Sequence, residues 1–276
     1  MTDVQALALG FLQGFSEWLP ISSTAHVAVG LRLFGLSDSA AFGSVFTAVS
    51  QLGSVLAALI YFRRDIAAVL AKPGFMGQAV EADQTDRRLL LPIAAGTLPV
   101  VICGLLFKDA IEGPLRGMNV IAGSMISFAI ILAWVDWRST KQRTLGSITL
   151  IDGIIIGIGQ AFSLIPGASR SGTTITAALA AGFERATAAR FSFLLSLPAI
   201  TGAGLYELIR HWEAVMAAGM VRPIVIATVT AFVVGWASID LLLKFLRRNS
   251  MTAFVLYRFV VGGVIIMLVM SGVIAP

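Results

Sequence analysis

The sequence has few of the residues that a soluble enzyme would use. Its 276 residues include one cysteine and two histidines, and only 13% are charged. Soluble domains carry about 25% charged residues. Here 57% of the residues are hydrophobic, and the mean hydropathy is +0.89. The lone Cys103 excludes an internal disulfide and a thiolate metal cluster. The composition therefore excludes a water-soluble globule.

The basic excess is small and does not indicate nucleic acid. A net charge of +5 in an apolar chain is typical of loops that lie beside lipid headgroups. No segment resembles an RNA- or DNA-reading module, so we expect no nucleic-acid partner. The first residues, Met1-Thr2-Asp3, lack the basic stretch of a cleaved signal peptide, and we expect the N-terminus to be retained.

Six apolar runs are long enough to cross a membrane as helices, which takes about 20 residues. They cover residues 43–62, 89–107, 118–135, 187–209, 223–243 and 252–274. Four shorter stretches, 4–15, 24–35, 151–164 and 173–183, would reach only about 16 to 21 Å as helices. They form two pairs, each broken by a polar turn that contains proline. We expect two re-entrant hairpins, because irregular backbone at membrane depth must be buried in protein or line a wet cavity.

The two hairpins resemble copies of one another. Three residue pairs are each separated by 146 positions: Pro20 and Pro166, Ser23 and Ser169, Ser50 and Ser196. This predicts one membrane domain, residues 1–276, with repeat one at 1–138 and repeat two at 148–276, joined by the polar connector 138–147. Three spans per repeat is an odd number, so repeat two must be inverted. The predicted fold is an all-α polytopic membrane protein, an inverted repeat with six transmembrane helices plus two re-entrant helical hairpins.

The distribution of basic residues favours six spans over eight. Six spans place five basic residues on one side, Arg32, Lys108, Arg116, Arg210 and Arg222, and twelve on the other, Arg63, Arg64, Lys72, Arg87, Arg88, Arg138, Lys141, Arg143, Arg185, Lys244, Arg247 and Arg248. If each hairpin crossed as a kinked span, the split would be ten and seven. Basic residues concentrate on the cytoplasmic side, so we expect both termini outside the cytoplasm.

Polar side chains inside the first hairpin indicate a site, because such groups are costly in lipid. Gln13 and Glu17 are four residues apart and would share a helix face, where they could hold a hard cation such as Mg²⁺ or Ca²⁺. Alternatively, Glu17 pairs with Arg170. Ser23 and His26 are three apart and could form a nucleophile with its base, although serines also cap helices.

The second hairpin contains a Gly/Ser turn with an arginine, Pro-Gly-Ala-Ser-Arg-Ser-Gly-Thr-Thr at residues 166–174. Such a turn before a helix presents backbone N–H groups to an anion. Arg170 adds a planar fork that matches phosphate oxygens. We predict a phosphate site with further donors from Gly167, Ser169, Ser171 and Thr174. The implied substrate is a phosphorylated headgroup on a long apolar tail, and the implied reaction is phosphoryl transfer to water.

This second motif and the run Leu-Gly-Phe-Leu-Gln-Gly-Phe-Ser-Glu-Trp-Leu-Pro-Ile-Ser-Ser-Thr-Ala-His at residues 9–26 resemble the undecaprenyl-diphosphate phosphatases, also called bacitracin-resistance proteins. The resemblance covers essentially the whole chain. It implies hydrolysis of undecaprenyl diphosphate to the monophosphate carrier used for cell-wall synthesis, in the bacterial inner membrane, with a divalent cation and a site facing the periplasmic or outer side. Gln13 stands where many members have glutamate, which removes a charge from the metal site.

The resemblance assigns roles to Gln13, Glu17, Ser23, His26, Ser169, Arg170 and Thr174. We expect Ser23 to be the nucleophile, His26 its base, Arg170 the phosphate clamp and Glu17 with Gln13 the cation ligands. Attack by water or by His26 remains open. A flippase or transporter without hydrolysis is the alternative function, and a homodimer is possible.

Overall fold

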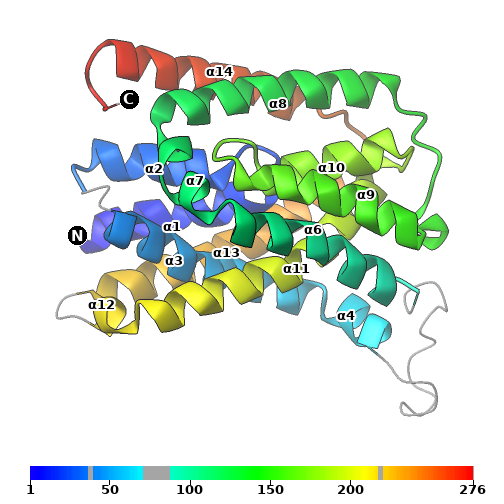
Figure 1. The fold of residues 1–276 in the computed structure, drawn as a ribbon, viewed down its shortest axis with the longest axis horizontal. Coiled ribbons are helices and arrows are strands. Elements are labelled where there is room, and N and C mark those ends of the chain that lie inside the picture. The colour runs from blue at the N-terminus through cyan, green and yellow to red at the C-terminus, as the bar shows by residue number, and fades with distance from the viewer. Residues whose placement is uncertain (37–39, 71–87, 217–219, 276) are drawn as a thin grey trace.

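The computed structural model describes residues 1–36, 40–70, 88–216 and 220–275, and this part of the chain is helical (Figure 1). Two of the basic residues counted for topology, Lys72 and Arg87, lie outside the described residues. In Figure 1 most of the longer helices run along the long axis of the molecule, and both chain ends lie at the same end of it.

Helices occur at every segment for which the sequence predicts one. The first half contains α1 (Asp3–Trp18), α2 (Ser23–Leu33), α3 (Ala40–Tyr61), α4 (Arg63–Leu70), α6 (Leu90–Leu106), α7 (Lys108–Glu112), η1 (Pro114–Arg116) and α8 (Met118–Arg138). The second half contains η2 (Leu145–Ser147), α9 (Leu150–Ala161), η3 (Phe162–Leu164), α10 (Arg170–Ala180), α11 (Arg185–Arg210), α12 (Trp212–Met216), α13 (Val221–Leu246) and α14 (Thr252–Met270).

Length and composition identify four or five of the described helices as membrane-spanning. Within the described residues, α8, α11, α13 and α14 are long and apolar enough to cross a membrane, and a fifth span results if α6 counts together with the bent segment that follows it. The chain is therefore a multi-pass membrane protein. The six-span topology with two re-entrant hairpins stays a prediction.

The two broken helices have the same local structure. α1–α2 and α9–α10 lie in opposite halves of the ribbon in Figure 1. Ser22 and Ser169 precede the returning helices with positive φ angles of 74° and 71°, and each side chain accepts a bond from an amide three residues on. The structural match is thus Ser22 with Ser169, one residue away from the predicted Ser23–Ser169 pair. Gln13 and Gln160 have the same spacing of 147.

Each hairpin packs mainly against a helix of the other half. α1 packs against α13, and α9 packs against α6. α3 packs against α11, and α8 lies along α14. Exchanging the two halves converts the α1–α13 pair into the α9–α6 pair. The α3–α11 and α8–α14 pairs each map onto themselves, as expected of a pseudo-twofold axis. The predicted boundaries of the repeats, 1–138 and 148–276, stay a prediction.

The connector between the halves is packed against the second hairpin. Arg143 pairs with Asp152 at 2.6 Å and lies over the ring of Phe183. The amides of Gln142 and Arg143 donate to the carbonyl of Gly182. These contacts attach the connector to the ends of α9 and α10.

The largest buried apolar cluster lies beside the first hairpin's turn. Trp18 meets Phe193 of α11 edge-on with ring centroids 5.1 Å apart, and Phe62 packs against the same ring. Because Trp18 is the last residue of α1, this packing fixes where the helix ends. The same packing fixes the position of the preceding residue, Glu17.

Glycines let the hairpins approach their partner helices closely. A Cβ on Gly157 of α9 would lie 2.2 Å from the carbonyl oxygen of Gly96 on α6. A Cβ on Gly10 of α1 would lie 2.4 Å from the carbonyl oxygen of Ala227 on α13. Both values are far below van der Waals contact, so a side chain at either position would push the helices apart.

We predict that Gly157→Ala lowers the melting temperature of the detergent-solubilised protein, because overpacking costs about 1–3 kcal/mol. The matched control is Gly263→Ala on α14, where an added Cβ meets no heavy atom within 4 Å. The control should melt at the original temperature or slightly higher, since alanine favours helix by about 1 kcal/mol. Equal melting of both variants would contradict the close approach.

Candidate active site

A small polar pocket lies between the two broken turns. The first hairpin contributes Glu17, Ser22, Ser23 and Thr24, and the second contributes Ser163, Gly167, Ser169 and Arg170. Glu17 is the last-but-one residue of α1, Ser23 is the first of α2, and Arg170 is the first of α10. The structure thus brings together residues that are about 150 positions apart in the sequence, as the inverted repeat predicts.

The Glu17 carboxylate is the centre of this arrangement. Its Oε2 accepts bonds from Ser23 Oγ at 2.7 Å and from Gln13 Nε2 at 2.7 Å. Its Oε1 accepts bonds from Gln51 Nε2 at 2.8 Å and Arg170 at 3.2 Å. The Glu17 side chain is only 3% exposed, so these four donors replace the water that a buried carboxylate loses.

The donors around Glu17 also bear on the predicted cation site. No cluster of three or more acidic, histidine or cysteine side chains occurs among the described residues. Gln13 directs its nitrogen at Glu17, and its buried Oε1 has no hydrogen-bond partner. One carboxylate, amide oxygens and a serine hydroxyl are hard oxygen ligands that fit Mg²⁺ or Ca²⁺ when a substrate supplies further oxygens. Gln13 and Glu17 therefore fit an incomplete cation site.

His26 lies beside the pocket but does not contact Ser23. Its Nδ1 is 2.7 Å from the carbonyl oxygen of Ser22, and its Nε2 is 2.7 Å from the hydroxyl of Tyr257, whose ring stacks on the imidazole. A carbonyl only accepts, so Nδ1 carries the hydrogen and Nε2 accepts from Tyr257 in the neutral ring. The expected Ser23–His26 hydrogen bond is absent from the described chain, because Ser23 donates to Glu17 instead.

Two helix N-termini converge on the pocket. Ser22 and Ser169 cap α2 and α10, and the first amides of each helix have no acceptor within the helix. Gly167 adopts a φ of +93°, and a Cβ there would lie 2.1 Å from Ser124 Oγ, so this turn requires glycine. The positive ends of both helices face the space beside Arg170, which favours an anion.

Ser171 and Thr174 do not line this pocket, although we expected both to bind phosphate. Ser171 Oγ donates to the carbonyl of Leu19 at 2.8 Å. Thr174 is fully buried, and its hydroxyl bonds to the carbonyl of Arg170 at 2.7 Å and to Ser192. The positions of these residues on α10 direct both hydroxyls into the protein and away from the pocket. Ser171 fastens one turn to the other, and Thr174 fastens α10 to α11.

Arg258 of α14 is a site residue that the sequence analysis missed. It is 0% exposed, and it donates to the carbonyls of Pro20, Gly167 and Ala168 at 3.3, 3.1 and 3.0 Å. Its Nε donates to Met125 at 3.0 Å. One guanidinium therefore joins both broken turns to α8. The sequence does contain a signal for this residue, because an arginine inside the apolar run 252–274 is costly in lipid.

Gln51, Ser163 and Tyr257 were also missed. Gln51 is a polar residue in the apolar run 43–62, which was a usable signal. Ser163 follows α9 and Tyr257 lies on α14. Neither residue stands out from its neighbours in the sequence. These residues reach the site only through the packing of helices that are distant in sequence.

A multi-pass helical protein with a buried carboxylate, a serine hydroxyl and an arginine at the meeting point of two helix N-termini has the machinery of a membrane-embedded phosphoryl-transfer enzyme. The family model described as "Bacitracin resistance protein BacA" matches residues 6–264. The chain belongs to this family.

Curated relatives resemble the chain over its full length. A protein of Myxococcus xanthus is 44% identical over 278 residues, which cover 100% of this chain and 92% of the relative. A protein of Chlorobium phaeovibrioides is 41% identical with 100% of both chains covered. One of Renibacterium salmoninarum is 42% identical over 99% of this chain and 98% of its own length. All three are named undecaprenyl-diphosphatase.

We predict that Arg258→Met lowers both the melting temperature and the catalytic rate. Methionine fills similar space but leaves the carbonyls of Pro20, Gly167 and Ala168 without a donor, and each orphaned group costs about 1–3 kcal/mol. Arg258→Lys should recover part of the stability, because an ammonium can reach some of the same carbonyls. Differential scanning fluorimetry and phosphate release measure the two effects. A Met variant with unchanged melting and rate would contradict this role of Arg258.

Proposed function

We propose that the chain hydrolyses undecaprenyl diphosphate to undecaprenyl phosphate and inorganic phosphate in the pocket between the two hairpins. The enzyme class follows from the family and from full-length relatives named undecaprenyl-diphosphatase. The geometric observation that carries the site is the Ser23 hydroxyl bonded to Glu17 beside Arg170. Family membership links this activity to cell-wall synthesis and bacitracin resistance. It does not favour a carrier without hydrolysis.

Ser23 is the nucleophile in this proposal, and Glu17 takes its proton. Ser23 Oγ attacks the terminal phosphorus while its hydrogen passes to Glu17 Oε2, 2.7 Å away. The bond between that phosphorus and the bridging oxygen breaks, and undecaprenyl phosphate leaves with the electron pair. Water then attacks the phosphorus of the phosphoserine, the bond between phosphorus and Ser23 Oγ breaks, and Glu17 returns its proton to Oγ as dihydrogen phosphate leaves. Glu17 replaces His26 as the base because Glu17 is the group within hydrogen-bond reach of Ser23.

His26 is a positioning residue on this mechanism. Its Nδ1–H bond to the Ser22 carbonyl supports the positive φ at Ser22, and this angle sets the direction in which Ser23 enters α2. Tyr257 holds the other ring nitrogen. A strained N-cap that is held from two sides keeps the nucleophile aimed at the pocket.

Arg170 clamps the transferred phosphoryl group. The bond to Glu17 uses one edge of the guanidinium, and a guanidinium has five N–H donors, so others remain for phosphate oxygens. Its side chain is 26% exposed and lines the pocket. Ser169 and the first amides of α10 add donors to the same oxygens. The ion pair and the clamp are therefore compatible.

A divalent cation, Mg²⁺ or Ca²⁺, fits beside Glu17 and Gln13 in this proposal. When bound it would neutralise the oxygens of the diphosphate. The support is the donor chemistry of the pocket and the unpartnered Oε1 of Gln13. Because this chain has glutamine at position 13, substrate oxygens must supply more of the coordination than they would beside a second glutamate.

We place the protein in the bacterial inner membrane with the pocket open to the periplasmic or outer side. The support is the twelve-to-five distribution of basic residues and the resemblance of the two motifs to this family. The apolar tail of the substrate would remain in the bilayer while its headgroup enters the pocket.

We predict that the purified protein releases phosphate from undecaprenyl diphosphate and that Ser23→Ala lowers the rate on the order of 10³-fold or more while substrate binding persists. Ser163→Ala is the control: it removes a hydroxyl from the same pocket that has no bond to Glu17, so its loss should be much smaller. A chelator should stop release by the unmodified protein, and Mg²⁺ or Ca²⁺ should restore it. Near-normal turnover by Ser23→Ala would eliminate the serine mechanism.

Arg170→Lys separates a clamp from a simple ion pair. Lysine keeps the charge but loses the fork, so we predict a rate loss on the order of 10²-fold or more. The double variant Arg170→Ala with Glu17→Ala should have a rate no higher than that of Arg170→Ala alone, because Glu17 also serves as the base. Phosphate release at saturating Mg²⁺, with melting curves as the folding check, decides between the two. An active lysine variant together with rescue in the double variant would show that Arg170 only balances the charge of Glu17.

A further inference from the structure

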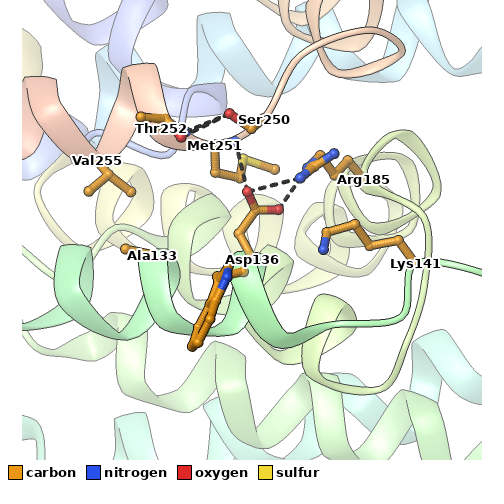
Figure 2. A pocket seen from close by; sticks show the side chains of 9 residues that line it. Ala133, Asp136, Lys141, Arg185, Ser250, Met251, Thr252 and Val255 are labelled. Carbon is orange, nitrogen blue, oxygen red and sulfur yellow. Dashed lines mark hydrogen bonds and ion pairs between the residues drawn. The ribbon is translucent and has the colours of Figure 1, made fainter.

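A second pocket lies at one end of α8 and α14, and it shares no lining residue with the first (Figure 2). Its volume of about 330 Å³ falls in the range of small-molecule sites, about 300–1,000 Å³. The last turn of α8, the first turns of α11 and α14 and the connector supply its walls: Ala133, Asp136, Trp137, Lys141, Arg185, Ser250, Met251, Thr252 and Val255.

The acidic group in this pocket is already neutralised. Asp136 accepts two bonds from Arg185, at 2.7 and 3.1 Å, and a third from the amide of Met251 at 3.2 Å. Figure 2 shows Arg185 and Lys141 on one side of Asp136 and Thr252 with Val255 on the other. Arg185 cancels the charge of Asp136. The pocket therefore has a net positive charge, which comes from the ammonium of Lys141.

Lys141 is held without a carboxylate partner among the described residues. Its Nζ donates to the carbonyl of Ser139 at 2.8 Å, which leaves two of its three N–H donors for a ligand. Its backbone adopts a φ of 53°, an uncommon angle for lysine, so the connector turns sharply at this residue. The hydroxyls of Ser250 and Thr252, bonded to each other at 2.9 Å, lie across the pocket.

The other walls are apolar. Ala133 and Val255 line the space between α8 and α14, and Trp137 is 75% exposed with Arg138 over its ring. Both helices are long and apolar enough to span a membrane, so their adjoining ends lie at one membrane surface. Tryptophan and arginine side chains gather at the headgroup level.

We propose that this pocket binds the phosphate of an anionic glycerophospholipid. Lys141 and the hydroxyls of Ser250 and Thr252 contact the phosphate oxygens, and an acyl chain lies against Trp137, Ala133 and Val255. Basic pockets between membrane helices suit anionic headgroups for the same electrostatic reason. The proposal does not depend on the phosphatase mechanism, because the two pockets have separate residues.

The test uses quenching of tryptophan fluorescence by lipids with brominated acyl chains in mixed micelles. Brominated phosphatidylglycerol should quench at a lower mole fraction than brominated phosphatidylcholine, and Trp137→Phe should remove this difference. Lys141→Asn, in which asparagine tolerates the positive φ, should raise the half-quenching mole fraction of phosphatidylglycerol about fivefold or more. Thr252→Val should raise it about threefold without a change of charge.

The control is Lys244→Gln, which removes one positive charge from an ion pair with Asp240 at the end of α13. It should leave the half-quenching fraction within about twofold of the unmodified protein. Equal quenching by both lipids, no effect of Lys141→Asn and Thr252→Val, or an equal loss in Lys244→Gln would overturn the pocket. Inorganic phosphate that abolishes quenching, when chloride at matched ionic strength does not, would assign the pocket to free phosphate and overturn the lipid.

Discussion

The Arg258 guanidinium holds the two broken turns at one point, and the geometry of the candidate active site depends on it. A buried positive charge without a nearby carboxylate is costly in a membrane protein. Here four carbonyl dipoles solvate it, from Pro20, Gly167, Ala168 and Met125. The carbonyls of Pro20, Gly167 and Ala168 lie in the broken turns and would lose this donor without Arg258. The same bonds orient the turns so that the N-termini of α2 and α10 point into one pocket.

The pseudo-symmetry explains how an asymmetric site arises from matched halves. At the spacing of 147 shown by Ser22 and Ser169, Ser23 corresponds to Arg170, and Glu17 corresponds to Leu164. The proposed nucleophile and the proposed clamp therefore occupy equivalent first positions of two helices. They meet because both bond to Glu17, one at each carboxylate oxygen. The second half has Leu164 at the matching place, so the halves supply one carboxylate to the candidate site and not two.

The sequence predicts the positions of the helices and of the two breaks well, because hydropathy and interrupted apolar runs directly reflect the cost of backbone and side chains in lipid. It also places Glu17, Ser23, Gly167, Ser169 and Arg170 at one site. It fails where helix rotation decides the outcome: Ser171 and Thr174 turn into protein, and His26 turns to Tyr257. It misses Arg258 and Gln51, because the partners that satisfy their side chains lie on elements distant in the sequence. Contacts made by helices that are distant in sequence carry no local signal.

The Glu17 carboxylate has to serve two purposes, and its hydrogen bonds show how both are possible. Oε1 faces Gln51 and Arg170, whereas Oε2 faces Gln13 and Ser23. The first oxygen orients the arginine while leaving other guanidinium donors accessible. The second accepts the hydrogen bond of Ser23 and is the proposed acceptor of its proton. A phosphate beside Ser23 and Arg170 therefore need not displace Glu17, although the pocket, about 30 Å³ in volume, must widen before it holds a diphosphate headgroup.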